Sequence, residues 1–171
     1  MSPVPLYIIM AHEDDPRKCT AARMVRFGDA KAASAKRVPH GAIVLDPSAE
    51  KSISAEDREV ALRHGLLAVD CSWNRLTEFP RVRGGLRHRA LPFVVPTNPT
   101  NFGKAQKLST AEAFAAALYI LGEREQAEGI MSRLKWGPSF LPINKAALDL
   151  YAGAKDSAEV VRIQNELLGV G

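Results

Sequence analysis

The chain has few cysteines and few aromatic residues. Among its 171 residues are two Cys, while Phe, Trp and Tyr together make up 6%. Two cysteines, Cys19 and Cys71, cannot build a disulfide framework, so the expected compartment is the cytoplasm. Neither belongs to a Cys-x-x-Cys pair, which favours small buried or half-buried thiols over a redox pair.

Long apolar runs are also absent. The longest, residues 6–11 and 113–121, have the size of a core strand and a core helix. A membrane span needs roughly 18 apolar residues, so no membrane partner is expected. No basic segment precedes the first run, so a signal peptide is not expected either. With 25% charged and 46% hydrophobic residues, the composition is that of an ordinary soluble globular protein.

The common phosphate-binding and catalytic fingerprints are missing. The sequence contains no G-x-G-x-x-G, G-x-x-x-x-G-K-[ST] or G-x-S-x-G, and no zinc-protease helix. His12, Asp14 and Asp15 lie close together, but no further His or Cys follows at a spacing that suits a metal. A solvated turn is the favoured interpretation, and no metal is expected.

What is present is an alternation of strand-like and helix-like segments. Short apolar runs alternate with amphipathic stretches up to about residue 95, which predicts an α/β fold with a mostly parallel sheet. The expected organisation is an N-terminal α/β domain over residues 1–92 and a C-terminal, mainly helical domain over residues 93–171. The expected strands are 6–11, 42–45, 66–69 and 91–95, and residues 32–40 are expected to form a loop or short turn. The expected helices are 18–27, 54–63, 111–121, 123–134, 144–151 and 157–168, with capping boxes at Ser54–Asp57 and Ser109–Glu112.

Ligands of such sheets bind beyond the carboxyl ends of the strands, so the segments that follow strands are the first places to look for a site. These segments are residues 12–15, 46–48 and 70–73. In the last of them, Asp70 and Trp73 can bring a carboxylate and an indole into one pocket. A core tryptophan beside an N-capping aspartate explains the same residues, and the sequence leaves both interpretations open.

The positive charge is concentrated in the first half of the chain. The formal net charge is +4, and acidic and basic residues balance after residue 90. The basic residues are densest between Arg75 and Arg89, where Glu78 alone opposes them. Because the arginine fork binds phosphate bidentately, this cluster points to a polyanion, with nucleic acid as the first choice. A solvated loop with incidental arginines remains the alternative.

Eight short segments together resemble one family. They are Asp15-Pro16-Arg17-Lys18-Cys19-Thr20, Leu45-Asp46-Pro47, Ser54 with Asp57, Asp70-Cys71-Ser72-Trp73, Arg89-Ala90-Leu91-Pro92, Asn98-Pro99-Thr100-Asn101-Phe102-Gly103, Leu108-Ser109-Thr110-Ala111-Glu112-Ala113, and Lys135-Trp136-Gly137 with Phe140. In order and spacing they resemble the small-subunit ribosomal RNA aminocarboxypropyltransferases, a ribosome-biogenesis family of archaea and eukaryotes. The resemblance spans about residues 6–151, and the compact length is similar to the archaeal form.

The resemblance implies a fold and a reaction. The fold is an N-terminal α/β part and a C-terminal helical part in a trefoil-knotted arrangement similar to the SPOUT methyltransferases. The cofactor is S-adenosylmethionine, from which the 3-amino-3-carboxypropyl group is transferred instead of the methyl group. The acceptor is N3 of an N1-methylpseudouridine in small-subunit (16S-type) rRNA. The expected partner is this rRNA or the pre-ribosomal small subunit, and a monomer is expected.

The resemblance also implies which residues hold the cofactor. They are Thr20, Leu45, Pro47, Val69, Trp73, Leu91, Gln106, Leu108 and Thr110. Thr20 would hold the amino-acid end, and the carbonyl of Val69 would meet the ribose hydroxyls. Backbone groups of Leu91 and Gln106 would read adenine. The family often has an aromatic residue where Gln106 stands, so adenine affinity should fall if a ring normally packs there.

The chemistry and the RNA contacts follow from the same resemblance. Trp73 is expected to cover the methyl group, so that the methylene of the amino-acid side chain faces the RNA. Asp70 is the candidate base for the N3 proton, or else an electrostatic stabiliser of bound cofactor. The expected RNA-binding residues are Arg75, Arg81, Arg83, Arg87 and Arg89, followed by Lys18, Arg23 and Arg26.

Two other functions compete with this one. A SPOUT-type RNA methyltransferase would share the fold and the cofactor and would differ in which carbon faces the acceptor. A non-catalytic assembly factor would bind rRNA and sense the cofactor weakly or not at all. Measuring cofactor binding discriminates the second from both enzymes.

Overall fold

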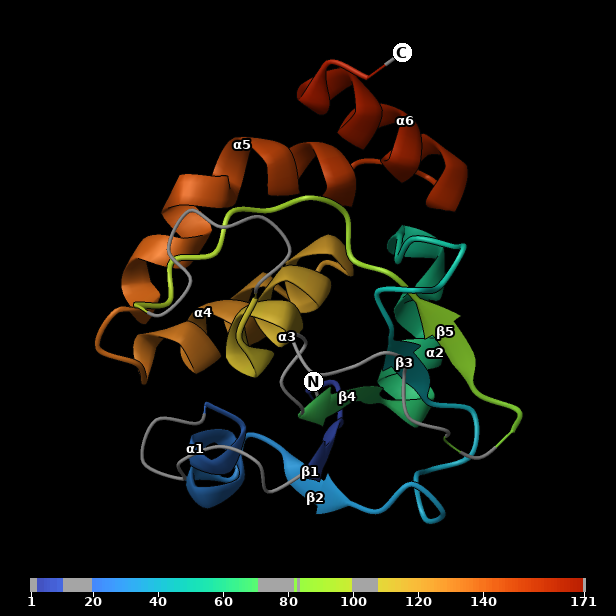
Figure 1. Cartoon of the computed structure of the whole chain (residues 1–171), viewed down its shortest axis with the longest axis vertical. Helices are drawn as coiled ribbons and strands as arrows, with labels where there is room; N and C mark the ends of the chain where they lie inside the picture. The colour runs from blue at the N-terminus through green and yellow to red at the C-terminus, as the bar shows by residue number, and fades with distance from the viewer. Residues whose placement is uncertain (1–2, 11–19, 71–81, 83, 100–107, 171) are drawn as a thin grey trace.

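A computed structural model of the chain describes residues 3–10, 20–70, 82, 84–99 and 108–170, with Asp70 described by its backbone alone. The described N-terminal part combines strands and helices, whereas the part from residue 108 onward is helical (Figure 1). The predicted α/β class is therefore confirmed. No helix of the described residues is long and apolar enough to cross a membrane.

The described strands form one five-stranded sheet in which every pairing is parallel. The strand order is β2-β1-β4-β3-β5. The strands are β1 (Leu6–Met10), β2 (Lys31–Ala33), β3 (Ile43–Leu45), β4 (Leu66–Asp70) and β5 (Arg87–Arg89). Because all five run the same way, their carboxyl ends share one edge of the sheet, and the mostly parallel sheet predicted from the alternation is confirmed.

The two faces of the sheet pack against different sets of buried residues. Ile8 and Leu66 point into the large core beneath the helices and are fully buried. The alternate residues point the other way. Leu67 packs with Val38 and Val44 in a smaller cluster, and Tyr7 lies against it. This two-residue alternation follows from strand geometry, and it explains why the central strands are apolar on both faces.

The helices gather on the side of the large core (Figure 1). They are α1 (Thr20–Phe27), α2 (Arg58–His64), α3 (Thr110–Ile120), α4 (Arg124–Ser132), α5 (Phe140–Ala152) and α6 (Ser157–Leu168), with short 3-10 turns at Ala55–Asp57 and Gly137–Ser139. Helix α3 is central, because it packs against α1, α4, α5 and β4. Phe114 and four of its five alanines are fully buried, as its uniform apolar sequence predicts.

Two expected elements differ from the structure. Residues 32–40 were expected to lack a strand, but Lys31–Ala33 pairs in parallel with β1 at the edge of the sheet. Lysine and alanine have low strand propensity, so backbone pairing with an existing strand, and not the local sequence, forms β2.

The expected strand over residues 91–95 is not a strand, and β5 lies just before it. Pro92 has no N–H to give to a ladder. The backbone of this extended segment is satisfied instead by side chains of the C-terminal helices. Phe93 N donates to Gln164 Oε1 (2.8 Å), and Val95 N donates to Asn144 Oδ1 (2.7 Å). The Asn144 amide also donates to Val95 O (2.9 Å). Figure 1 shows the segment running beside α5.

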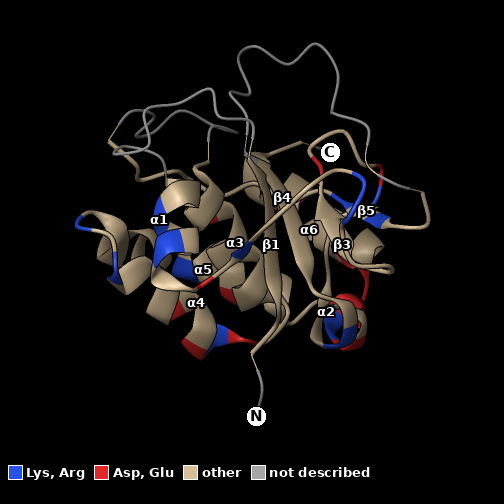
Figure 2. Ribbon diagram, turned by 90° about the horizontal axis from the view of Figure 1, so that it is seen from below, with Lys and Arg blue, Asp and Glu red and all other residues tan. Residues whose placement is uncertain are grey.

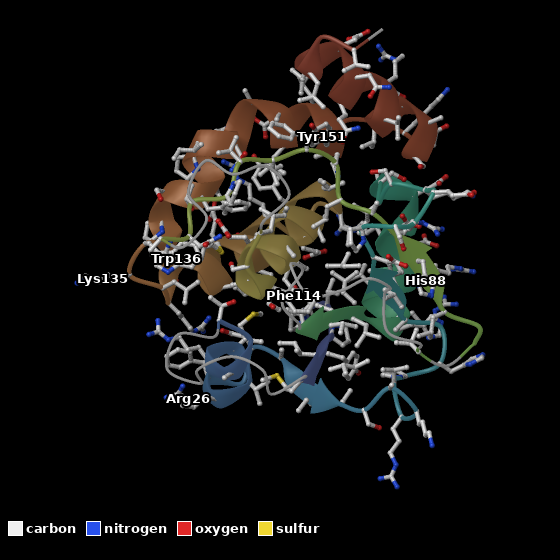
Figure 3. The ribbon with its side chains drawn as sticks, in the orientation of Figure 1. Arg26, His88, Phe114, Lys135, Trp136 and Tyr151 are labelled. Carbon is white, nitrogen blue, oxygen red and sulfur yellow. The ribbon has the colours of Figure 1, made fainter. Side chains whose placement is uncertain are left out.

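Tyr151 of α5 completes this set of contacts. Its hydroxyl donates to Phe93 O at 2.8 Å, close to the light-green segment in Figure 3. Burial raises the pKa of Tyr151 to about 12, so the phenol stays protonated and keeps donating at any physiological pH. Three side chains of the helical part, Asn144, Tyr151 and Gln164, thus hold residues 91–95 by hydrogen bonds.

The expected domain boundary near residue 92 stays a prediction. One hydrophobic core contains residues from both expected domains, for example Ile8 and Leu66 from the sheet and Phe114 and Leu148 from the helices. The two halves of the chain therefore share one folded core in the described residues.

A buried carboxylate fixes the start of α3. Glu112 is fully buried and forms the predicted capping box: Ser109 N donates to its Oε1 (2.9 Å), and Glu112 N donates to Ser109 Oγ (3.2 Å). The same carboxylate accepts from Thr97 N (2.6 Å) and Asn98 Nδ2 (2.7 Å). Glu112 therefore ties residues 97–98 to the first turn of α3.

Replacing Glu112 with Gln should destabilise the fold. Thr97 N donates to one carboxylate oxygen and Ser109 N to the other, and the new amide keeps only one oxygen. One of these buried donors therefore loses its acceptor, at a cost of roughly 1–3 kcal/mol. Urea unfolding followed by circular dichroism measures this change. The matched control is Glu125→Gln on the exposed face of α4, which removes the same charge without a buried network. Equal unfolding midpoints for the two variants would contradict the structural role of Glu112.

Candidate functional site

A cavity of about 230 Å³ opens at the carboxyl edge of the sheet, where the end of β3 and the end of β4 meet the start of α3. The segment that follows β5 and the last turns of α6 complete its wall. The lining residues are Leu45, Asp46, Pro47, Ala68, Val69, Leu91, Pro92, Phe93, Val94, Leu108, Ser109, Thr110, Ala113, Gln164 and Leu168. Most of them are apolar, with a few polar groups among them, as in a typical small-molecule site.

Many of the residues expected to bind the cofactor lie together in this cavity. The lining includes Leu45, Pro47, Val69, Leu91, Leu108 and Thr110. These residues come from four separate segments of the chain, and only folding brings them together. Trp73 and Gln106 lie outside the described residues.

Thr20 lies beside the cavity instead of in the set of residues that line it. It is the first residue of α1 and is buried, and its hydroxyl accepts from Ala111 N at 3.2 Å. The hydroxyl therefore joins the start of α1 to the first turn of α3, next to Thr110. Asp70 is the last residue of β4 and pairs in register with Met10 of β1, which puts its backbone at the same carboxyl edge.

Asp46 is a cavity residue in one of the strand-end segments that the sequence marked as a place to look for a site, although it was not among the residues expected to bind the cofactor. Its Oδ1 accepts from Ser48 N (2.8 Å) and Ser48 Oγ (2.6 Å), and its Oδ2 lies 2.8 Å from His88 Nδ1 of β5. Burial by itself would raise the pKa of Asp46, but the hydrogen bonds from Ser48 and the contact with His88 outweigh it. The pKa therefore lies below its usual value, and the carboxylate stays charged near neutral pH.

Phe93, Ser109 and Gln164 also line the cavity and were not expected there. The capping box at Ser109 was a signal for that residue. The sequence contains no signal for Gln164, because its partner Phe93 lies 71 positions earlier in the chain. Nothing in a helical pattern tells which strand-end segment a distant helix will reach.

The basic residues are divided between two places. Arg87 is exposed on β5, and Arg26 is exposed on α1. Figure 2 shows Lys and Arg on α1 and at β5, which lie at opposite ends of the sheet. Arg23 of α1 is half-buried and has a partner. The remaining expected RNA contacts, except Arg89, lie outside the described residues: Lys18, Arg75, Arg81 and Arg83.

Arg89 is engaged inside the protein. Its Nε lies 3.2 Å from Asp57 Oδ2, its side chain is 15% exposed, and its Nη1 donates to His88 O at 2.9 Å. Asp57 also accepts from Ser54 N at 3.2 Å. Arg89 therefore links β5 to the turn before α2, and its guanidinium is not presented to solvent as those of Arg87 and Arg26 are.

The described residues contain no group of three or more His, Cys, Asp or Glu side chains that could hold a metal ion. The chemistry that the cavity supports is the binding of a small, largely apolar molecule with a few hydrogen-bonding groups. Its place at the strand ends puts that molecule where loops and basic residues from several elements can approach it.

Residues 43–168 match the family described as "Ribosome biogenesis protein, C-terminal". Residues 4–32 match one described as a possible Fer4-like domain in RNase L inhibitor. The latter segment contains a single cysteine, Cys19, whereas the common iron–sulfur clusters are held by four thiolates. The match over residues 4–32 therefore does not indicate a cluster in this chain.

Individual proteins match over nearly the whole chain. A 16S rRNA aminocarboxypropyltransferase of Methanopyrus kandleri is 50% identical over 168 residues, which are 97% of this chain and 99% of that protein. Another, from Methanosarcina acetivorans, is 49% identical over 168 residues, covering 96% of this chain and 95% of that protein.

A solved structure is similar in fold as well as in sequence. It is described as the SAM-dependent rRNA:acp-transferase Tsr3 from Vulcanisaeta distributa. It has a TM-score of 0.87 and 42% identity, and the match covers 98% of this chain and 91% of that one. Since sequence and fold agree along almost the entire length, the chain belongs to the 16S rRNA aminocarboxypropyltransferase family, as the order of its motifs predicted.

Proposed function

We propose that this protein transfers the 3-amino-3-carboxypropyl group of S-adenosylmethionine to N3 of an N1-methylpseudouridine in small-subunit rRNA. The observation that carries the proposal is the convergence in one cavity of residues that the family resemblance assigned to the cofactor. They come from the ends of β3 and β4, from the segment after β5 and from the start of α3. The solved relative is described as SAM-dependent, which agrees with the predicted cofactor.

The cavity suits the adenosine part of this cofactor. Leu45 and Pro47 offer an apolar wall to a flat ring, and Val69 lines the same space. Thr110 and Leu108 close the opposite side from α3 and the residues before it. Thr20 sits next to them at the start of α1, on the β1 side, and this is the direction in which the amino-acid end would extend.

The transfer itself exchanges one bond for another. N3 of the nucleotide attacks the side-chain methylene next to the sulfonium, a C–N bond forms and the C–S bond breaks. The sulfur leaves with both electrons as 5′-methylthioadenosine, and the N3 proton passes to a base. Asp70 at the end of β4 is the proposed base or electrostatic stabiliser, and Trp73 is proposed to cover the methyl group.

The RNA is proposed to approach over the exposed side chains of Arg87 on β5 and Arg26 on α1. Arg89 is held by Asp57 and contributes to β5 instead. The remaining proposed contacts are Lys18, Arg23, Arg75, Arg81 and Arg83. We further propose that the protein is a cytoplasmic monomer with a knotted chain path. Its proposed physiological partner is the pre-ribosomal small subunit.

A double-label assay tests the reaction. The protein is mixed with small-subunit rRNA carrying N1-methylpseudouridine, and with S-adenosylmethionine labelled either on the methyl or on the carboxyl carbon. Carboxyl label should enter the RNA, and methyl label should not. Transfer of methyl label would identify a methyltransferase with the same fold. Intact RNA binding with neither label transferred would favour a non-catalytic assembly factor.

Replacing Asp70 with Asn separates its two proposed roles. If Asp70 takes the N3 proton, single-turnover transfer should slow by roughly 100-fold or more while the dissociation constant for S-adenosylmethionine changes little. Calorimetry measures the binding, and carboxyl-label transfer measures the rate. A parallel loss of binding and rate would assign Asp70 to charge stabilisation alone, and unchanged transfer would remove it from the mechanism.

Arg87 should contribute to RNA affinity through phosphate. In Arg87→Ala, the log–log slope of RNA affinity against salt should become shallower by about one unit. The control is Arg124→Ala in α4, which lies toward the other end of the strands (Figure 2) and is paired with Glu128. RNA-binding titrations between about 50 and 300 mM salt measure the slope for each of the two variants. Identical slopes for the two variants would count against the proposed RNA face.

A further inference from the structure

Helix α6 reaches the cavity through one polar side chain. Gln164 lines the cavity together with Leu168, one turn further along the same helix. Both residues face the segment that follows β5, where Leu91 and Phe93 form part of the same wall. Gln164 is half-buried, so its amide is partly shielded from water.

The orientation of the Gln164 amide is set by the protein. Phe93 N lies 2.8 Å from Gln164 Oε1, and a backbone N–H can only donate. The oxygen must therefore face Phe93, and the NH₂ group occupies the other position. Within the described part of the chain, Gln164 Nε2 has no hydrogen-bond partner of its own.

The backbone that orients Gln164 is itself supported by further hydrogen bonds. Tyr151 donates to Phe93 O (2.8 Å), and Asn144 binds both Val95 N (2.7 Å) and Val95 O (2.9 Å). These bonds hold the Phe93 backbone, and Phe93 N in turn orients the Gln164 amide. A Gln164 NH₂ group that is already oriented loses little entropy when it binds a ligand.

The surroundings of the amide suit a flat heterocycle. Leu45, Pro47 and Leu91 line the cavity with apolar atoms, and the unused polar group from α6 is a donor. Adenine offers three ring nitrogens that accept hydrogen bonds, while its exocyclic amine donates. A donor at this place therefore complements a ring nitrogen and not the amine.

We infer that Gln164 Nε2 donates a hydrogen bond to a ring nitrogen of the adenine of S-adenosylmethionine, which makes Gln164 a specificity-determining residue. The inference rests on the proposed function, because it takes the cavity to be the cofactor site. It adds a role for the C-terminal helix, which the motifs of the sequence did not assign to the cofactor.

The first test is Gln164→Glu in the full-length protein. The carboxylate still accepts from Phe93 N–H, so the wall keeps its support, but the donor is replaced by a second acceptor. Calorimetric titration with S-adenosylmethionine should show binding weakened by roughly tenfold. The melting temperature without ligand should stay close to that of the unsubstituted protein.

The matched control is Asn165→Asp, the same amide-to-acid change at the next position of α6, a residue outside the cavity lining. A negative charge near a cationic cofactor would by itself strengthen binding, so electrostatics cannot imitate the expected loss. Binding by Asn165→Asp should stay within about twofold of the unsubstituted protein, and an equal loss in both variants would overturn the inference.

The second test changes the ligand. Binding of 5′-methylthioadenosine is compared with binding of its 1-deaza, 3-deaza and 7-deaza analogues, in each of which a C–H replaces one ring nitrogen. One analogue should bind the unsubstituted protein roughly tenfold more weakly than 5′-methylthioadenosine does. In Gln164→Glu, that analogue and 5′-methylthioadenosine should bind equally well, as expected when both changes remove the same hydrogen bond. Additive losses for all three analogues would overturn the inference.

The two tests also separate this inference from the proposed function. If the unsubstituted protein binds no S-adenosylmethionine, the proposed function fails and the inference fails with it. If the unsubstituted protein binds the cofactor and Gln164→Glu binds it equally well, only the role of Gln164 is overturned.

Discussion

The cavity depends on one constraint: the backbone that follows β5 cannot join the sheet. Pro92 removes a donor, and a buried backbone without partners would be costly. The chain meets this constraint with side chains from the far end of the sequence. Asn144, Tyr151 and Gln164 supply the bonds that a neighbouring strand would otherwise supply. The cavity wall is therefore held by the helical half of the protein.

The opposite wall is held in a related way. Glu112 is a buried acid with no cation among its described partners, and backbone and amide donors surround it. Those donors belong to residues 97–98 and to the N-terminus of α3, so one carboxylate joins both sides of the connection that enters the helical half. Thr20 adds a bond from α1 to the same turn of α3. These contacts join segments that are distant in the sequence, so they tie the site to the core.

Charge and apolar surface are divided between different parts of the molecule. The described lining of the cavity is mostly apolar, and its acidic side chain is Asp46, held by Ser48 and His88. Exposed arginines stand outside it, on β5 and α1. An enzyme that transfers a group from a small cofactor to a polyanion needs its apolar and basic surfaces to be separate. A phosphate backbone inside an apolar pocket would lose its hydration without compensation. Arg89 shows that an arginine in the basic segment can instead serve the fold.

Much of this protein follows from its sequence alone. Apolar runs located β1, β3 and β4, the capping box located α3, and the order of eight motifs identified the family, because these signals are local or are read along the chain. Tertiary structure decided the rest. Lys31–Ala33 became a strand only because β1 offered an edge, and residues 91–95 did not become one because helices α5 and α6 took their hydrogen bonds. Gln164 joined the cavity for the same reason: a contact between residues 71 positions apart is set by how the core packs, and no local pattern encodes it.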